Sequence, residues 1–357
     1  MDTNEHPELE SQDDSSWLLE TLPIDIATGD PALGPLLTKL HESYISSGRD
    51  KRLSSQFDRL VDSAVLPQHS GAARRLEGRA LFVMGESGAG KSRSLSYLFS
   101  KRPNLNPYET EIGTMRPLVS VVAPSPCTLR QLANEILDTI EYKTTTDLKE
   151  NIAWRIVKQQ LKQRRTIILH IDEVQHCLQN RTDHESQKLL DTLKNLMQSP
   201  DWPVCLVLSG LPEFGKFARR DKQIPFRSRM ISLPPLSIPA DLKWVKFMVK
   251  AIFERLELDI SALSSDTFYL RLCHAASNLT GRIARFIQGA GEEAIYGHRN
   301  AVTVNDFAEF YAAHSACDPD ENIFLVRDWH LIDPNASLDV EDEEADDLKR
   351  GRKRGRK

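Results

Sequence analysis

The part of this sequence that most constrains its fold is a glycine-rich segment that follows an apolar run, ALFVM, and precedes residues at helical spacing. The segment reads Gly85, Glu86, Ser87, Gly88, Ala89, Gly90, Lys91 and Ser92, which fits the pattern G-x-x-x-x-G-K-[ST]. Its glycines allow successive N–H groups to point at one phosphate, and the following helix adds its positive N-terminal dipole. Lys91 can reach the β- and γ-phosphates, and Ser92 can offer its hydroxyl to Mg²⁺. The segment predicts a strand, a phosphate-binding loop and a helix, with ATP and Mg²⁺ as ligands.

A second motif, TIILHIDEVQH at 166–176, leads an apolar run into two acidic residues, Asp172 and Glu173. Ligands of open α/β sheets bind at the carboxyl ends of the strands, which is where these carboxylates are expected. We expect Asp172 to hold Mg²⁺ through water, and Glu173 to orient and polarise the water that attacks the γ-phosphate. Another strand candidate lies between the two motifs. The combination indicates the branch of phosphate-loop ATPases that carries its catalytic glutamate in cis, so it predicts hydrolysis of ATP to ADP and phosphate.

Three further sites each have a functional and a plainer interpretation. Ser209 follows an apolar run and would sense the γ-phosphate or the attacking water, or it belongs to a Ser-Gly turn that ends a strand. Arg229, just before the last strand candidate, would enter a neighbouring subunit's nucleotide site, with Arg227 as the second choice, or it is a solvated surface residue. Arg285 would swing onto the phosphates when a helical lid closes, and it is better placed for this than Arg282. A salt bridge on the helix surface is the alternative for both lid arginines.

Apolar runs alternate with helical patterns through the middle of the chain. The strand candidates are 80–84, 118–123, 166–171, 204–209 and 230–233. The helical candidates between them are 90–100, 127–141, 147–164, 185–198 and 213–221. This alternation predicts an α/β fold with a five-stranded parallel sheet covered by helices. After Pro239 only helical patterns follow, which predicts a small α-helical lid domain with helices at 241–257, 265–276, 281–296 and 304–314.

These patterns divide the chain into five parts. They are an acidic, largely disordered segment at 1–32, a helical lead-in at 33–78, the nucleotide-binding α/β domain at 79–239, the lid at 240–316 and a C-terminal extension with a charged tail at 317–357. In the lead-in, Leu53, Phe57 and Leu60 recur on one helical face. Trp17 and Trp329 are expected either to dock partners or to pack against their own chain.

The net charge of −5 conceals an uneven distribution. Residues 1–38 contain nine Asp or Glu and no Lys or Arg, and residues 339–357 contain seven acids followed by seven bases, so the body between them carries +4. The five cysteines form no C-x-x-C pair, which excludes a zinc ribbon and argues against a disulfide framework. No run of 18 apolar residues occurs and the N-terminus is acidic, so we expect a cytoplasmic protein with no membrane-spanning helix or secretory signal.

Taken together, these motifs resemble an AAA+ ATPase. The chain also resembles the TniB/TnsC group of transposition ATPases over roughly residues 35–330. The similar segments are MGESGAGKS, LVSVVAPSPCTLRQLANEIL, IDEVQH, LSGLPEF and FLVRDW. The resemblance implies an ATP-bound homo-oligomer, a ring or filament, that assembles on double-stranded target DNA and recruits or activates a DDE-type, integrase-core transposase. It also implies ATP contacts from Gly85 to Ser92, Mg²⁺ at Ser92 and Asp172, and hydrolysis by Glu173, with Ser209 as sensor and Arg229 as finger. One departure lies in the lid, where Ala284 stands at the position that usually carries arginine.

The sequence leaves two other functions open. One is a helicase-loader-like or other nucleic-acid remodelling ATPase, and the other is a nucleotide-gated signalling switch with no role on DNA. The lack of an appended repeat array disfavours the switch, whereas only the resemblance favours transposition over remodelling. Arg130 and Lys143 flank the helix after the second strand and would line the pore of an oligomer, where weak phosphate contacts add up. The basic tail either adds DNA contacts or is shielded by the acids before it.

Overall fold

The computed structural model describes residues 30, 33–69, 78–143, 148–178, 182–221 and 224–335. Its centre is a five-stranded sheet in which all pairings are parallel and the strand order is β4-β5-β6-β1-β7. The strands are β1 (Ala80–Met84), β4 (Leu118–Val122), β5 (Ile168–Asp172), β6 (Cys205–Gly210) and β7 (Ser228–Ser232). The predicted fold is confirmed, and each strand begins and ends within two residues of its predicted bounds.

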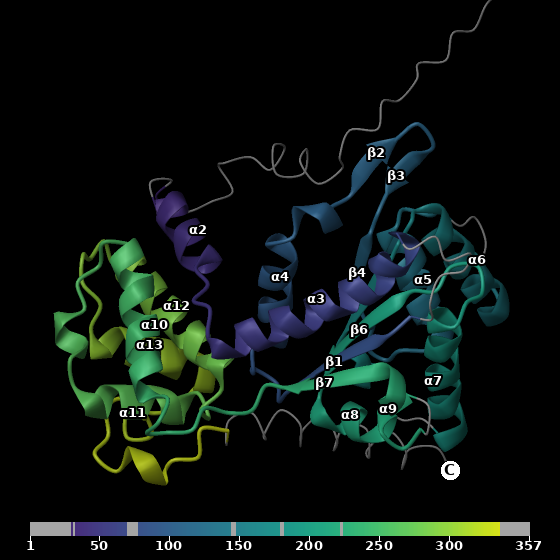
Figure 1. The fold of residues 1–357 in the computed structure, drawn as a ribbon. Coiled ribbons are helices and arrows are strands. Elements are labelled where there is room, and N and C mark those ends of the chain that lie inside the picture. The colour runs from purple at the N-terminus through teal and green to yellow at the C-terminus, as the bar shows by residue number, and fades with distance from the viewer. Residues whose placement is uncertain are drawn as a thin grey trace, which may run out of the picture.

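Helices cover both faces of this sheet (Figure 1). One face packs against α3 (Gly48–His69) and α4 (Lys91–Ser100), with Leu81 and Val83 of β1 pointing toward them. The other face packs against α5 (Leu129–Thr139), α6 (Glu150–Gln163), α7 (Asp183–Met197) and α8 (Pro212–Ala218). Every residue of β1, β5 and β6 is buried, as expected for central parallel strands. The carboxyl ends of these strands therefore lie side by side, and they carry both predicted motifs.

Three local features differ from the expectations. A short hairpin of β2 (Tyr108–Thr110) and β3 (Gly113–Met115) stands between α4 and β4, and its strands are too short to leave an alternating pattern. The helix expected at 213–221 ends earlier, at Ala218 of α8, and a further short helix, α9 (Ile224–Arg227), follows that was not predicted. The last strand begins earlier than predicted, so Arg229 lies inside β7 and not before it. Because β7 is an edge strand with exposed polar positions, its first residues do not look apolar.

The lid contains α10 (Leu242–Arg255), α11 (Asp266–Ala275), α12 (Thr280–Tyr296) and α13 (Val304–Ser315), as predicted. The lead-in contributes α2 (Gly34–Glu42), whose Leu40 is buried in the core of the lid. Short 3₁₀ turns lie at η3 (Pro103–Leu105), η4 (Val174–Cys177), η5 (Ser261–Leu263) and η6 (Trp329–Leu331). Figure 1 shows the lid beside the α/β part, with α3 beginning near the lid and running across the α/β part.

The segment after the lid packs against it. Ile323 and Phe324 are buried in the lid core, and the half-buried Trp329 ring meets His274 edge-on at 5.3 Å between centroids. Of the two interpretations of Trp329, contact with its own chain is therefore the observed one. Trp17, the acidic N-terminal segment and the charged tail lie outside the described residues. Among the helices that are described, none combines the length and the apolar character needed to cross a membrane.

Candidate nucleotide-binding site

The phosphate loop joins the end of β1 to the start of α4, and two glycines shape its backbone. Gly88 has a φ of 83° and Gly90 a φ of 88°, in a left-handed region that costs a residue with a side chain about 1–2 kcal/mol. Within the described residues, the amides of Gly88, Gly90, Lys91 and Ser92 donate to no protein acceptor. Because α4 begins at Lys91, the last two are orphan donors of a helix N-terminus. The loop thus presents several unsatisfied N–H groups, which is the arrangement that binds a phosphate.

Lys91 adds a positive charge to this loop. Its side chain is 4% exposed, and its ammonium donates to the carbonyl oxygens of Gly85 at 3.0 Å and Glu86 at 3.2 Å. Both acceptors are neutral, so the positive charge is not compensated by them. A phosphate oxygen is a stronger acceptor for an ammonium than a carbonyl is. The position of Lys91 therefore suits the predicted contact with a nucleotide.

Asp172, at the end of β5, is joined to the loop through Ser92. The Asp172 carboxylate is buried and accepts hydrogen bonds from the hydroxyls of Ser92 and Ser209 and from the Glu173 amide, the last two at 2.5 and 2.9 Å. Burial raises the pKa of Asp172, but these hydrogen bonds and the neighbouring His170 outweigh burial and lower the pKa overall. The carboxylate is therefore ionised at neutral pH. A hydroxyl and an ionised carboxylate in contact are the oxygen donors that Mg²⁺ takes, so these two residues fit the predicted ion.

Two residues linked to Asp172 through Ser209, His170 and then Ser120, were not singled out from the sequence. His170 is 4% exposed, and its Nε2 lies 2.9 Å from the Ser209 hydroxyl. Its Nδ1 lies 2.7 Å from the hydroxyl of Ser120 on β4. Burial lowers the pKa of His170 to about 4, so the imidazole is neutral. The available signal is a single histidine inside the otherwise apolar run IILHID.

Glu173, the predicted catalytic glutamate, has an unusual backbone. Its φ is 50°, in the left-handed region that residues with side chains seldom adopt and that is concentrated at functional sites. Its Oε2 accepts a hydrogen bond from the Gln175 side-chain amide. Gln175 Oε1 in turn accepts from the Leu211 amide at 3.1 Å, just after β6. Gln175 therefore fixes the direction of the glutamate relative to the sheet, a role that the sequence did not reveal.

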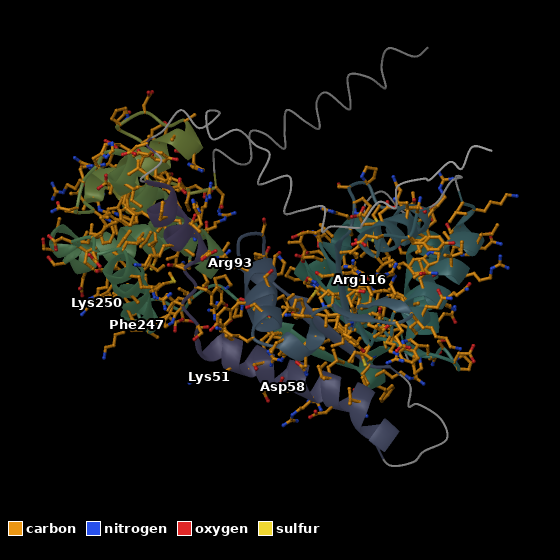
Figure 2. All side chains as sticks on the ribbon, turned by 90° about the horizontal axis from the view of Figure 1, so that it is seen from above. Lys51, Asp58, Arg93, Arg116, Phe247 and Lys250 are labelled. Atoms are coloured by element: carbon orange, nitrogen blue, oxygen red, sulfur yellow. The ribbon has the colours of Figure 1, made fainter. Side chains whose placement is uncertain are left out.

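A pocket of about 390 Å³ opens beside the loop, between the lead-in, α4 and the lid. Its lining includes Tyr44, Gly90, Arg93, Trp244 and Arg285. Figure 2 shows Arg93 where the α/β part faces the lid. The Trp244 indole N–H is buried and has no acceptor among the described residues, so an acceptor on a ligand would satisfy it. The sequence placed no ligand contact in the lead-in or at Trp244, because neither belongs to a phosphate motif.

Tyr44 shows how the lead-in shapes this pocket. Its ring stacks on Tyr97 of α4 at 4.2 Å between centroids, and its hydroxyl donates to Asp50 and lies 3.0 Å from Ser94 Oγ. Burial, and then the bond to Asp50, raise the pKa of Tyr44, so the phenol remains protonated. The lead-in is thereby attached to the helix that begins at the phosphate loop.

The lid touches the phosphate loop through the first turn of α12. The Arg282 amide donates to the Gly88 carbonyl at 3.1 Å, and the Arg282 side chain donates to Asn335 at 2.7 Å. Arg285 lines the pocket, and its guanidinium carbon lies 5.9 Å from the centre of the Phe310 ring. Both lid arginines are thus close to the loop. Arg282 contacts it directly, although the sequence favoured Arg285.

We expect Gly281→Ala to weaken ATP binding about tenfold, equivalent to ~1.4 kcal/mol. A Cβ at Gly281 would lie 2.6 Å from the Gly88 carbonyl oxygen and 2.8 Å from the Gly90 nitrogen, so the lid would have to move away from the loop. Titration with a fluorescent ATP analogue measures the effect. Gly48→Ala is the matched control, because no atom lies within 4 Å of a Cβ there. Equal affinities of the two variants would show that the lid contact does not support binding.

Arg229 lies apart from this cluster. It pairs with Leu81, four residues before Gly85 along β1, which places it about 13 Å along the strand direction from the loop. Its guanidinium donates to Gln56 of α3 at 2.7 Å and is otherwise exposed. The structure therefore brings Lys91, Ser92, Asp172, Glu173 and Ser209 together at the carboxyl ends of the strands. It places Arg229 toward the opposite, amino ends of the strands.

Comparison with known proteins supports this description of the fold. Residues 74–217 match the family model described as an AAA domain, and comparison with curated proteins gives no match. The chain is similar to the ORC1 protein of Aeropyrum pernix, solved in complex with DNA, at 17% identity and a TM-score of 0.54, over 80% of this chain and 70% of that one. CDC6P from Pyrobaculum aerophilum is similar at 10% identity and a TM-score of 0.52, over 80% and 75%.

The ORC2 protein of Aeropyrum pernix, solved with ADPNP and ADP, is similar at 12% identity and a TM-score of 0.50, over 79% of this chain and 75% of that one. At these identities the likeness concerns the fold: a five-stranded parallel sheet followed by helices. The family match spans the phosphate loop, the acidic motif and the strands that carry them. Residues 74–217 thus match the AAA domain model, and the fold is similar to that of the ORC and CDC6 structures.

Proposed function

We propose that this protein binds and hydrolyses ATP, and that it regulates DNA transposition as an oligomer on target DNA in the manner of TniB and TnsC. The observation that carries the nucleotide part is the phosphate loop itself. Its unsatisfied amides, the Lys91 ammonium and the Ser92–Asp172 contact converge at the carboxyl edge of one sheet. This is a ready site for a triphosphate and its metal ion.

The residues have separate tasks in hydrolysis. The loop amides and Lys91 bind the β- and γ-phosphates, and Ser92 and Asp172 hold Mg²⁺, which neutralises charge on the phosphates when it is bound. Glu173 orients the attacking water through its carboxylate, whose direction is held by Gln175. Most of the rate enhancement comes from positioning and electrostatic stabilisation, so small displacements of these groups have large effects on the rate.

Arg229 acts on a different subunit in this proposal. Because it lies about 13 Å along β1 from its own loop, it reaches a nucleotide only in a neighbouring copy. An arginine supplied from a second subunit stabilises the charge of the transition state. The proposal therefore requires an oligomer in which the amino ends of the strands in one subunit face the nucleotide of the next subunit.

We expect Arg229→Ala to lower ATP hydrolysis by about 10³-fold while ATP binding is retained. A mixture of Arg229→Ala and Glu173→Gln subunits is expected to regain activity, because an intact glutamate then meets an intact arginine across an interface. Phosphate release measures both. Gln56→Ala, which removes the cis partner of Arg229 but keeps the guanidinium, is the control and should remain active. A mixture as inactive as its components would argue against a trans-acting arginine.

The transposition part rests on the sequence resemblance over roughly residues 35–330. Exposed Arg130 on α5 and exposed Lys143 are the proposed DNA contacts, repeated along a ring or filament so that weak phosphate contacts add up. The partner is a DDE-type transposase, and slow hydrolysis disassembles the oligomer. Negative-stain imaging with duplex DNA and a slowly hydrolysed ATP analogue tests this proposal. Nucleotide-dependent rings or filaments support it, and monomers indifferent to DNA refute it.

A nucleic-acid remodelling ATPase, such as a helicase loader, is the second candidate. The similarity to ORC1, which was solved in complex with DNA, supports a role on DNA without requiring a transposase. The two candidates differ in their output. Stimulation of strand transfer by a transposase encoded nearby supports the first, whereas loading of a helicase or ATP-driven strand separation supports the second.

A further inference from the structure

A continuous chain of hydrogen bonds crosses three neighbouring strands and ends on the carboxylate of Asp172. Ser120 of β4 lies 2.7 Å from His170 Nδ1, His170 Nε2 lies 2.9 Å from Ser209 Oγ, and Ser209 donates to Asp172 Oδ1 at 2.5 Å. This hydrogen-bond chain begins at Ser120, an exposed residue of the edge strand β4, and ends in the buried centre of the site. The motifs of phosphate-loop proteins do not account for its histidine.

Counting protons gives this chain a direction. An ionised carboxylate only accepts hydrogen bonds, so the single hydroxyl proton of Ser209 is used on Asp172. Toward His170 the same hydroxyl must therefore accept, which places the imidazole proton on Nε2. A neutral imidazole then has a bare Nδ1, which accepts from the Ser120 hydroxyl. The network thus assigns one tautomer of His170 and one orientation of each hydroxyl.

Burial leaves Ser209 and His170 no alternative partner in water. Ser209 is completely buried, His170 is 4% exposed, and the Phe99 ring meets the imidazole edge-on at 5.3 Å between centroids. Without the His170 N–H, the Ser209 hydroxyl would lose its buried donor and could turn away from Asp172. Asp172 Oδ1 also accepts from the Glu173 amide at 2.9 Å, so the chain helps to hold an oxygen that is tied to the catalytic turn.

We propose that His170 is a positioning residue: its Nε2–H commits the Ser209 proton to Asp172 Oδ1 and so keeps the other carboxylate oxygen directed at the metal site. This inference rests on the proposed ATPase function. It also gives Ser209 a different task from the predicted one, since a hydroxyl that donates to Asp172 has no proton left for the γ-phosphate. Ser209 then acts on the metal ligand and not on the phosphate.

Two substitutions at the same position test the proposal. His170→Leu removes the donor, whereas His170→Gln keeps an N–H at a similar distance from the backbone. We expect His170→Leu to raise the Mg²⁺ concentration needed for half-maximal ATP hydrolysis about tenfold, and His170→Gln to restore most of the wild-type value. Binding of ATP without Mg²⁺, which depends on Lys91 and the loop amides, should be the same in all three proteins. Loss of metal-free binding together with activity would show a merely structural role.

The second measurement needs no variant. Nitrogen-15 NMR of the wild-type protein should show His170 neutral, with the proton on Nε2 and none on Nδ1. Ser120→Ala, at an exposed position, should weaken that tautomer preference, and Val122→Ala on the same exposed face of β4 is its control. A proton on Nδ1, or equal Mg²⁺ dependence of His170→Leu and wild type, overturns the proposal. If wild type fails to bind ATP at all, the ATPase function itself fails, whichever tautomer is found.

Discussion

Lys91→Ala is expected to lower ATP affinity by at least 100-fold and to abolish nucleotide-dependent assembly on DNA with it. The Lys91 ammonium is buried against two neutral carbonyls of the loop, so its removal takes away the one full positive charge that the loop itself offers to the phosphates. A hydrogen bond to a charged group contributes about 1.5–3 kcal/mol, and Lys91 is expected to contact both the β- and γ-phosphates, so the loss of both contacts costs about 3 kcal/mol or more, on the order of 100-fold or more in affinity. Titration with a fluorescent ATP analogue measures affinity, and negative-stain imaging with duplex DNA measures assembly.

Lys101→Ala is the matched control, because Lys101 lies just after the same helix and is exposed. It should bind ATP as the wild type does. If Lys91→Ala also kept wild-type affinity, the loop would not be the nucleotide site. If it lost affinity but still assembled on DNA, nucleotide binding and assembly would be separate properties of the protein.

Glu173→Gln is expected to lower hydrolysis by about 10²–10⁴-fold, the usual range for a general base, while ATP remains bound. The glutamine keeps an oxygen that can accept from Gln175, so the turn after β5 should keep its shape. Because hydrolysis is proposed to disassemble the oligomer, this variant should accumulate in the assembled, DNA-bound form. Phosphate release and imaging are the two measurements.

The comparison of the two variants is sharper than either alone. Glu173→Gln should assemble more completely than wild type, and Lys91→Ala should not assemble. Glu213→Gln, an exposed glutamate on α8, controls for the change of charge and should behave as wild type. If Glu173→Gln assembled no better than Lys91→Ala, hydrolysis would not act as the timer of disassembly.

The sequence predicted the sheet and the centre of the site because both depend on local patterns. β1, β5 and β6 are buried at every position, so they read as continuous apolar runs, and the residues that follow them are held at one edge by parallel pairing. This is why Ser92 and Asp172, 80 positions apart, were expected together and are joined by a hydrogen bond. The spacing within the phosphate loop predicted the helix that begins at Lys91.

The remaining contacts depend on which elements become neighbours, and no local pattern contains that information. Tyr44 enters the pocket only because the lead-in returns to α4, and Gly281 meets the loop only because the lid folds back over it. His170 was overlooked because a single polar residue does not change the appearance of an apolar strand. Arg229 was expected before β7 because an edge strand alternates between buried and exposed positions. The first residues of β7 are polar, so they did not resemble a strand.

Calorimetric titration of the unmodified protein with ATP, in the presence and absence of Mg²⁺, tests the central claim most directly. The claim is that the loop from Gly85 to Ser92 binds a triphosphate whose metal ion is held by Ser92 and Asp172. We predict binding of one ATP per chain, tighter when Mg²⁺ is present. Absence of binding under both conditions would contradict the nucleotide site, and with it the assembly and the transposition role proposed for the protein.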